Sequence, residues 1–308
     1  MSFEWKGVFP ALLTPFTKNE ELDIDMYEKN LAAQVAAGVH GIIVGGSLGE
    51  ASTITEKEKE ELVEFSVEYL NEDIPVIMNI AEATTRDAIR HAANAKKWGA
   101  DGIMLLPPMR YKADDREAIA YFKAVAQSTD LPIMIYNNPH DYKIDIRPEM
   151  FDELVECENI TALKESSRDV TNLTRMKNRF GDRIKVLCGV DTIAMEELCL
   201  GADGWVAGLV DAFPNETVVI YNLVKEGRIE EATKIYRWFM PLLELDIHPK
   251  LVQYIKLAAA QTGIGSEYVR APRLTLVGEE RERILKIIND GINTRPALSK
   301  SVSAGAVV

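Results

Sequence analysis

Eight short runs of apolar residues recur along the first two thirds of the chain, and helical patterns separate them. Each run is almost continuously apolar, as is typical of parallel strands that are buried on both faces. The predicted strands cover residues 7–13, 41–44, 75–78, 102–106, 132–136, 160–164, 184–188 and 204–207. The charged, amphipathic stretches between them include 25–37, 55–70, 86–97, 115–127 and 147–155. The pattern predicts a (β/α)8 TIM barrel, whereas a doubly wound sheet would need fewer strands or an additional domain.

Several predicted helices carry end signals. Thr55 is followed three residues later by Glu58, which is a capping-box pattern, and Gly38 and Gly99 follow helical runs as C-caps. After the eighth run the pattern is purely helical, and four further helices are predicted at 216–225, 229–243, 250–261 and 279–289. We therefore expect a barrel over residues 1–212, a closing helix with a C-terminal helical extension over 213–294, and a disordered tail over 295–308.

The composition disfavours several classes of protein. A formal net charge of −13 argues against general affinity for nucleic acid or acidic membranes. The chain shows neither an apolar signal-peptide region after Met1 nor an apolar run of about 18 residues, so no membrane span is expected. Cys157, Cys188 and Cys199 lack metal or redox spacing and fit a reducing cytoplasm, and the four histidines are isolated, so no metal site is expected.

A lysine, Lys164, ends the sixth predicted strand. Loss of hydration at the end of a buried strand lowers the pKa of a lysine and makes its amine nucleophilic near neutral pH. Tyr136 ends the preceding predicted strand, and catalytic groups of TIM barrels lie at these strand ends, so the phenol is expected to face the same pocket and to move protons. The alternatives are a lysine that reaches solvent and a tyrosine on the barrel rim.

The loop 45–50 follows the second predicted strand and contains three glycines. Its backbone N–H groups are suited to a carboxylate, and Ser47 adds a hydroxyl that can relay a proton to Tyr136. It lacks the sequence of a P-loop and the spacing of a dinucleotide-binding loop, so a plain tight turn is the alternative. We expect Glu50 to brace the loop, and Arg110 to lie near the mouth of the site, where it meets an anionic substrate, a neighbouring subunit or only solvent.

Three motifs together resemble the class I, Schiff-base-forming dihydrodipicolinate synthase / N-acetylneuraminate lyase family over about residues 5–292. They are Gly46-Ser47-Leu48-Gly49-Glu50, Tyr136-Asn137-Asn138-Pro139 and Leu163-Lys164-Glu165-Ser166. The resemblance implies that Lys164 forms a Schiff base with a 2-oxo acid or cyclic imine, that Tyr136 shuttles protons with Ser47 in the relay, and that no metal or organic cofactor is needed. It also implies a homotetramer of tight dimers. The expected substrate-binding residues are Gly46, Ser47, Leu48, Arg110, Asn138, Gly189 and Gly208.

Four positions depart from the synthases of this family. Ser47-Leu48 stands where synthases have Thr-Thr, Arg110 replaces the tyrosine lent to the neighbouring subunit, and Asp141 replaces the arginine that grips the second substrate. These differences disfavour condensation of pyruvate with an amino-aldehyde acid.

The nearest resemblance is to the Δ1-pyrroline-4-hydroxy-2-carboxylate deaminases of hydroxyproline breakdown, through residues 107–112, 136–139, 164–167, 250–253 and 269–274. It implies that Lys164 attacks the ring imine carbon and that 2,5-dioxopentanoate and ammonia are released. The alternatives are 4-hydroxy-tetrahydrodipicolinate synthase, an aldolase or dehydratase of 2-keto-3-deoxy sugar acids, and a catalytically silent barrel that binds a 2-oxo acid.

Overall fold

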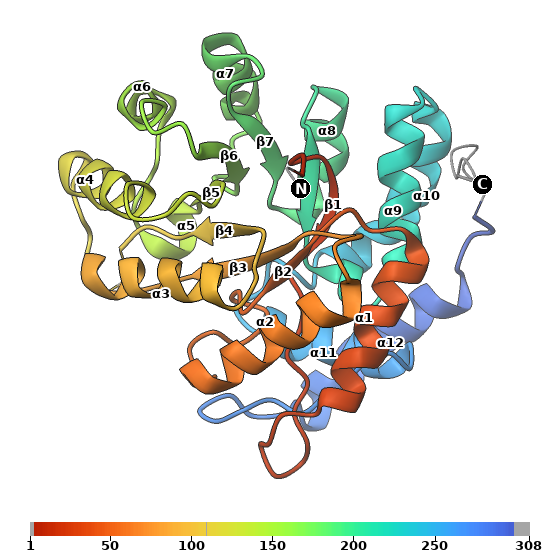
Figure 1. Cartoon of the computed structure of the whole chain (residues 1–308). Helices are drawn as coiled ribbons and strands as arrows, with labels where there is room; N and C mark the ends of the chain where they lie inside the picture. The colour runs from red at the N-terminus through yellow and green to blue at the C-terminus, as the bar shows by residue number, and fades with distance from the viewer. Residues whose placement is uncertain (1–2, 109, 299–308) are drawn as a thin grey trace.

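A single sheet of eight parallel strands forms the centre of the computed structural model, which describes residues 3–108 and 110–298 (Figure 1). The strands are β1 (Gly7–Pro10), β2 (Ile42–Val44), β3 (Val76–Ile80), β4 (Gly102–Leu105), β5 (Ile133–Asn137), β6 (Ile160–Glu165), β7 (Lys185–Cys188) and β8 (Gly204–Ala207). They pair in the order β1-β8-β7-β6-β5-β4-β3-β2, and a parallel bridge between Ala11 and Ile43 joins the two ends. The predicted (β/α)8 TIM barrel is confirmed.

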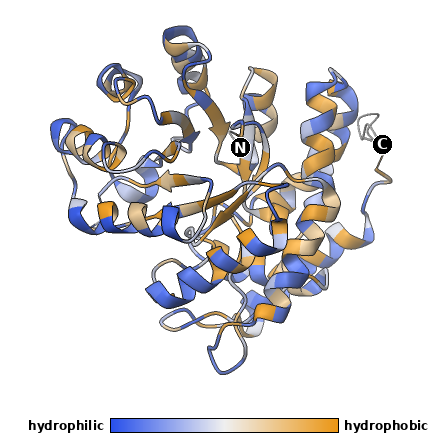
Figure 2. Cartoon of the chain, viewed as in Figure 1, coloured by the Kyte–Doolittle hydropathy of each residue, from blue (hydrophilic) through white to orange (hydrophobic). Residues whose placement is uncertain are grey.

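The strands are buried on both faces, as their continuous apolar sequences predicted. All five residues of β3 and all five of β5 are buried. Figure 2 shows the apolar strands at the centre and hydrophilic residues on the outer surfaces of the surrounding helices. Burial of apolar area on this scale is the main favourable term in folding.

The pairing of β5 with β6 sets the position of the predicted catalytic residues. Tyr136 lies opposite Lys164, and Asn137 lies opposite Glu165. Because successive side chains of a strand point to opposite faces, Tyr136 and Lys164 share one face of the sheet. On the other face Asn137 Nδ2 donates a hydrogen bond to Glu165 Oε2 at 3.2 Å.

Nine α-helices and three 3-10 turns surround the barrel in the described residues. They are α1 (Ile24–Ala37), α2 (Glu56–Leu70), α3 (Thr85–Lys97), α4 (Asp115–Ala126), α5 (Pro139–Tyr142), η1 (Pro148–Met150), α6 (Phe151–Leu154), α7 (Thr171–Phe180), η2 (Asp191–Ile193), α8 (Ala194–Cys199), η3 (Leu209–Asp211) and α9 (Pro214–Lys225). The capping box of Thr55 and Glu58 is present, and Gly38 ends α1 in the left-handed conformation. Gly99 also has a positive φ, one residue after the Trp98 cap of α3.

One predicted helix differs from the structure. The stretch 147–155 consists of the turn η1 followed by the four-residue helix α6, rather than one regular α-helix. Just beyond the end of α6, the Arg183 guanidinium donates to the carbonyl oxygens of Val155 and Cys157, at 2.8 and 2.9 Å.

The helical extension consists of α10 (Ile229–Leu243), α11 (Leu251–Gln261) and α12 (Gly278–Asn293). Helix α10 lies beside α9, and α12 packs against α10 and α11 (Figure 1). Arg295, where the tail was predicted to begin, donates from Nη2 to Glu216 Oε2 of α9 at 2.7 Å. The chain is therefore still tied to the barrel at that residue, and residues 299–308 of the predicted tail lie outside the described residues.

A buried ion pair joins the extension to the loop that follows β2. Lys256 Nζ of α11 lies 2.5 Å from Glu50 Oε1, and the two side chains are 1% and 0% exposed. The backbone N–H of Arg270 donates to the other Glu50 oxygen at 3.2 Å. Glu50 thus ties its loop to the helical extension through a partner from a distant part of the chain, which agrees with the expected bracing role.

Candidate active site

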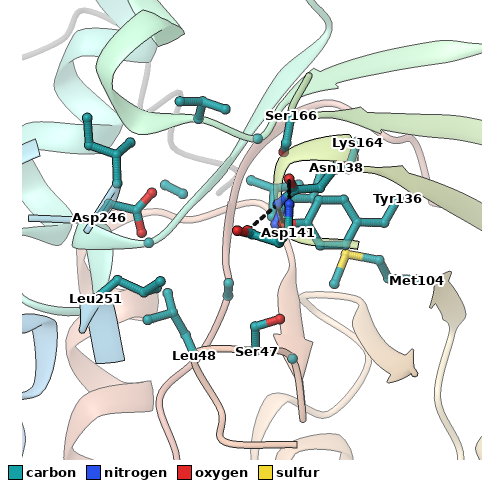
Figure 3. Close-up of a pocket in the computed structure, with 18 of the residues that line it drawn as sticks. Ser47, Leu48, Met104, Tyr136, Asn138, Asp141, Lys164, Ser166, Asp246 and Leu251 are labelled. Carbon is teal, nitrogen blue, oxygen red and sulfur yellow. Dashed lines mark hydrogen bonds between the residues drawn. The ribbon is translucent and has the colours of Figure 1, made fainter. Parts of the chain in front are cut away.

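A cavity opens at the carboxyl ends of the barrel strands (Figure 3). It encloses about 700 Å³ including its open mouth, and its lining comes from strand ends, from the loop after β2 and from the α10–α11 connection. Figure 3 shows Lys164, Tyr136 and Asn138 on one side and Asp246 and Leu251 across from them. The barrel and the extension therefore build the cavity together.

Lys164 reaches this cavity from the end of β6 and is 7% exposed. Its Nζ lies 4.0 Å from the centre of the Tyr136 ring. Burial lowers the pKa of the amine from its ordinary value, while the fields of Tyr142, Asp246 and Asp191 act in the opposite direction. In the described part of the chain, the Lys164 amine makes neither a hydrogen bond nor an ion pair with a carboxylate. A buried amine of this kind is available as a nucleophile.

Because Gly189 has no side chain, the Lys164 side chain can pack directly against its backbone. A Cβ atom at this position would lie 2.7 Å from Lys164 Cε and 2.1 Å from Ser166 Oγ, closer than real Cβ contacts allow. Gly189 thus lies at the cavity wall, as the sequence placed it, and its missing side chain positions the lysine.

Tyr136 is buried beside Lys164, and burial raises the pKa of its phenol to about 12. Asn138 Nδ2 donates to the Tyr136 hydroxyl at 3.1 Å, which partly offsets this rise in pKa. Asn138 also lines the cavity. The phenol is therefore held as a neutral group with one hydrogen-bond donor already aimed at its oxygen.

Ser47 makes a different contact from the one expected. The predicted relay joined Ser47 to Tyr136, but the Ser47 hydroxyl lies 2.7 Å from the hydroxyl of Tyr142 in α5. The Tyr142 ring packs edge-on against the Tyr136 ring, with 5.6 Å between their centres. Sequence reasoning missed Tyr142, although its position six residues after Tyr136, in the loop beyond a strand end, is a signal that could have found it.

The loop that carries Gly46, Ser47 and Leu48 is held at both ends. Asn79 Nδ2 of β3 donates to the Gly45 carbonyl at 3.0 Å, and the Thr14 hydroxyl donates to the Gly49 carbonyl at 2.8 Å. Gly46, Ser47 and Leu48 all line the cavity. The loop is thus a rigid turn whose small residues face the space above Lys164.

Asp246 and Asp191 are acidic residues that sequence reasoning missed. Asp246, in the α10–α11 connection, lines the cavity, and burial followed by the charge of Asp191 raises the pKa of its carboxyl group well above the usual range. Asp191 accepts hydrogen bonds from the backbone N–H groups of Gly208 and Leu209, at 3.2 and 2.8 Å. Gly208 also lies beside Asp246: a Cβ atom at Gly208 would lie 2.2 Å from Asp246 Oδ1.

Two charged residues, Asp141 and Arg168, line the distal part of the cavity, whereas Arg110, which was expected near its mouth, does not. Asp141 lines it, and Asp141 Oδ2 accepts a hydrogen bond from Asn138 Nδ2 at 2.7 Å. Arg168, which the sequence did not single out, also lines it. Arg110 is exposed in the loop between β4 and α4 and is not among the lining residues.

Within residues 3–108 and 110–298, no group of three or more His, Cys, Asp or Glu side chains is placed to hold a metal ion. The helices of the same residues include none that is long and apolar enough to cross a membrane.

The fold and the cavity define a (β/α)8-barrel protein with a buried amine and two phenols at the carboxyl ends of its strands. The sequence matches the dihydrodipicolinate synthetase family over residues 4–290. The chain belongs to this family of aldolase-type lyases, and it is an enzyme of that kind.

The matches with known relatives cover almost the whole chain. The 4-hydroxy-tetrahydrodipicolinate synthase of Kosmotoga olearia is 32% identical over 290 residues, which are 93% of this chain and 98% of the relative. That of Exiguobacterium sibiricum is 34% identical over 276 residues, 89% of this chain and 92% of the relative. The crystal structure of dihydrodipicolinate synthase from Aquifex aeolicus is similar with a TM-score of 0.88 and 29% identity, covering 93% of this chain and 98% of that one.

Proposed function

We propose that the chain is a lysine Schiff-base lyase that acts on a small 2-oxo acid, with condensation as the leading reaction. The observation that carries this proposal is the position of the Lys164 amine, which is buried, has a lowered pKa and lies 4.0 Å from the Tyr136 ring centre inside an open cavity. An unprotonated amine beside a proton-carrying phenol is what imine formation requires.

The proposed reaction begins when Lys164 Nζ adds to C2 of pyruvate and its carbonyl oxygen takes up a proton. The resulting carbinolamine loses water, helped by a proton from Tyr136, and leaves an iminium ion. Loss of a C3 proton then forms an enamine, whose C3 attacks the aldehyde carbon of the second substrate. The substrate carboxylate is proposed to accept hydrogen bonds from the backbone N–H groups of Ser47 and Leu48. The iminium ion itself serves as the electron sink.

Arg168 favours condensation with a second, carboxylated substrate. It lines the cavity, and its guanidinium makes neither a hydrogen bond nor an ion pair with any residue that the structure describes. A guanidinium binds a carboxylate through two parallel hydrogen bonds. We therefore propose that Arg168 binds the carboxylate of the second substrate, which the acidic Asp141 cannot do. Together with the name shared by the relatives, this supports the synthase reaction over the deamination suggested by the sequence.

Deamination of Δ1-pyrroline-4-hydroxy-2-carboxylate is the second candidate, favoured by two features of the distal cavity. Leu48 is an apolar wall that is only 4% exposed, and Asp141 stands where a second carboxylate would be repelled. In this reaction Lys164 adds to the ring imine carbon, the C4 hydroxyl leaves as water through an enamine, and two water molecules are added in hydrolysis. The net change is consumption of one water and release of ammonia and 2,5-dioxopentanoate.

The deciding experiment is borohydride trapping followed by peptide mass analysis, with pyruvate and with the cyclic imine tested separately. Condensation predicts a reduced pyruvate adduct on Lys164, consumption of pyruvate when aspartate semialdehyde is added, and no ammonia from the imine. Ammonia release from the imine would instead establish deamination. Failure of every 2-oxo acid tested, 2-keto-3-deoxy sugar acids included, to form an adduct would contradict the lyase proposal and favour a silent binding barrel.

The proposal includes cytoplasmic location and assembly as a homotetramer, as the family resemblance implies. Sedimentation of the purified chain measures the assembly directly.

A further inference from the structure

Two hydroxyl groups meet at the mouth of the cavity. The Tyr142 hydroxyl and Ser47 Oγ lie 2.7 Å apart, and the two residues come from α5 and from the loop after β2. The Tyr142 ring stands edge-on to the Tyr136 ring, at an interplanar angle of 79° and a centre-to-centre distance of 5.6 Å. Tyr136, Tyr142 and Ser47 all line the cavity. Three proton-carrying hydroxyls are therefore gathered above one amine.

The three hydroxyl-bearing residues differ in their access to solvent. Tyr136 is buried, Tyr142 is partly exposed and Ser47 is exposed. The hydroxyl groups of Ser47 and Tyr142 can therefore carry protons between the buried Tyr136 phenol and the solvent.

One residue, Asn138, positions both phenols. Asn138 Nδ2 donates to the Tyr136 hydroxyl at 3.1 Å, while Asn138 Oδ1 accepts from the Asp141 backbone N–H at 3.2 Å and so caps α5. Lys143 then ends α5 in the left-handed conformation. The single turn of helix that carries Tyr142 is therefore anchored to the residue that contacts Tyr136.

We infer that Tyr142 is the second phenol of the proton relay, so that this chain assembles the relay from its own residues. The inference rests on the proposed Schiff-base function and adds a residue to it. Arg110, the position counted as equivalent to the tyrosine that synthases lend to a neighbour, is exposed and does not line the cavity. Tyr142 supplies a phenol from within the same chain instead.

The relay balances at the dehydration step. Tyr136 gives its proton to the departing hydroxyl of the carbinolamine, which leaves as water. The Tyr136 oxygen takes a proton from Ser47 when the Ser47 hydroxyl turns toward it, and Ser47 takes one from Tyr142. Tyr142 regains a proton from solvent at the cavity mouth.

The test compares Tyr142→Phe with wild type in the rate of borohydride-trapped adduct formation with pyruvate. The Phe variant keeps the ring contact with Tyr136 and loses only the hydroxyl. Because proton transfer by a positioned group typically contributes roughly 100-fold or more, we expect the rate to fall by about 100-fold with little change in pyruvate half-saturation. We also expect a changed pH profile and solvent isotope effect, which a merely structural role would not produce. A wild-type rate with a wild-type pH profile would overturn the inference.

Tyr111→Phe is the matched control, because Tyr111 is 54% exposed and lies next to Arg110. It should retain the wild-type rate, and a loss at Tyr111 instead of Tyr142 would mean that the relay phenol comes from that loop. Ser47→Ala should slow the reaction like Tyr142→Phe, and the double variant should be little slower than either, because both act through one relay. Fully multiplicative effects would contradict a shared path.

Mixing two impaired variants distinguishes a relay within one chain from one between chains. Tyr142→Phe and Lys164→Ala are refolded together and assayed for pyruvate adducts. We expect no rate above the residual rate of Tyr142→Phe alone, since each site needs both residues from the same chain, and recovery toward the wild-type rate would overturn the inference. The proposed function fails separately, namely if the wild type forms no adduct with any 2-oxo acid.

Discussion

Lys164 Nζ lies 4.0 Å from the centre of the Tyr136 ring, at the ends of two paired strands that are adjacent in the barrel. The same register that pairs Tyr136 with Lys164 places a phenol within reach of any group bound to the amine. The face of an aromatic ring attracts an ammonium ion, whereas burial disfavours one. Because burial is the larger influence, the pKa of Lys164 is lowered, and the amine is prepared for nucleophilic attack.

Lys164→Ala should abolish adduct formation with pyruvate while leaving the barrel folded, because no other amine of the described residues lies over the Tyr136 ring. Intact mass after borohydride treatment and the circular dichroism spectrum measure the two effects. Lys59→Met is the control: Lys59 is also a buried lysine whose pKa burial lowers, but it does not line the cavity. An adduct on another lysine in the Lys164→Ala variant would show that a different amine carries the chemistry.

The rate of adduct formation should depend on pH through Lys164. Below the pKa of the amine the ammonium form dominates and cannot attack, so the rate rises as pH increases through that pKa. Since burial lowers this pKa from 10.5, the rise should occur at lower pH than for an exposed lysine. The initial rate of trapping across a pH series measures it, and an inflection near the ordinary lysine value would contradict the assignment.

Gly189→Ala should displace the lysine without unfolding the chain. The new Cβ would lie 2.7 Å from Lys164 Cε, so we expect a loss of at least about 10-fold in the trapping rate, since misplacement of a reacting group by about 1 Å costs up to 100-fold. Gly265→Ala is a control of similar strain, because its Cβ would lie 2.6 Å from Ala259 Cβ in the extension. Equal trapping losses in both variants would indicate a general destabilisation.

Lys256→Met should destabilise the fold, because it leaves the buried carboxylate of Glu50 with only the longer contact of the Arg273 guanidinium, at 3.5 Å. Removal of one member of a buried ion pair typically costs about 3–5 kcal/mol, and the remaining Arg273 contact should keep the loss near the lower value. Chemical unfolding at neutral pH measures the change. The double variant Lys256→Met with Glu50→Gln should recover part of the loss, and a double variant less stable than Lys256→Met alone would show that the lost ion pair is not the cause.

Glu197 of α8 should make stability depend on pH. Its side chain is 0% exposed, and burial raises its pKa from 4.5 to about 8, although the neighbouring Cys188 thiol partly opposes this rise in pKa. The folded state therefore holds this proton more tightly than the unfolded state. The resulting stabilisation is fully present below pH 4.5 and is lost as pH rises through about 8.

Glu197→Gln mimics the protonated carboxyl group at every pH. We expect it to match wild type near pH 4.5 and to be more stable by up to about 5 kcal/mol at pH 9, since one pKa unit corresponds to about 1.4 kcal/mol and the pKa rises from 4.5 to about 8. Urea unfolding at both pH values measures the difference. Glu196→Gln, an exposed neighbour on the same helix, should show no such pH dependence, and a parallel pH response of wild type and Glu197→Gln would refute the argument.

The sequence located Lys164 and Tyr136 because both end strongly apolar runs, and a strand end can be found from local periodicity alone. It missed Tyr142 because α5 is a single turn, too short to show a helical period. Asp246 was missed for another reason. It lies in the connection between α10 and α11, and it reaches the cavity only because the extension packs against the barrel.

Local apolar periodicity and turn signals thus determined the barrel, the order of its elements, and the strand ends where Lys164 and Tyr136 lie. Only the tertiary structure decided which hydroxyl Ser47 contacts, that Lys256 neutralises Glu50, and that Arg168 rather than Arg110 lines the cavity. The reason is physical. Strand formation and helix capping depend on residues a few positions apart, whereas these contacts depend on how whole elements pack and on which buried charges find partners.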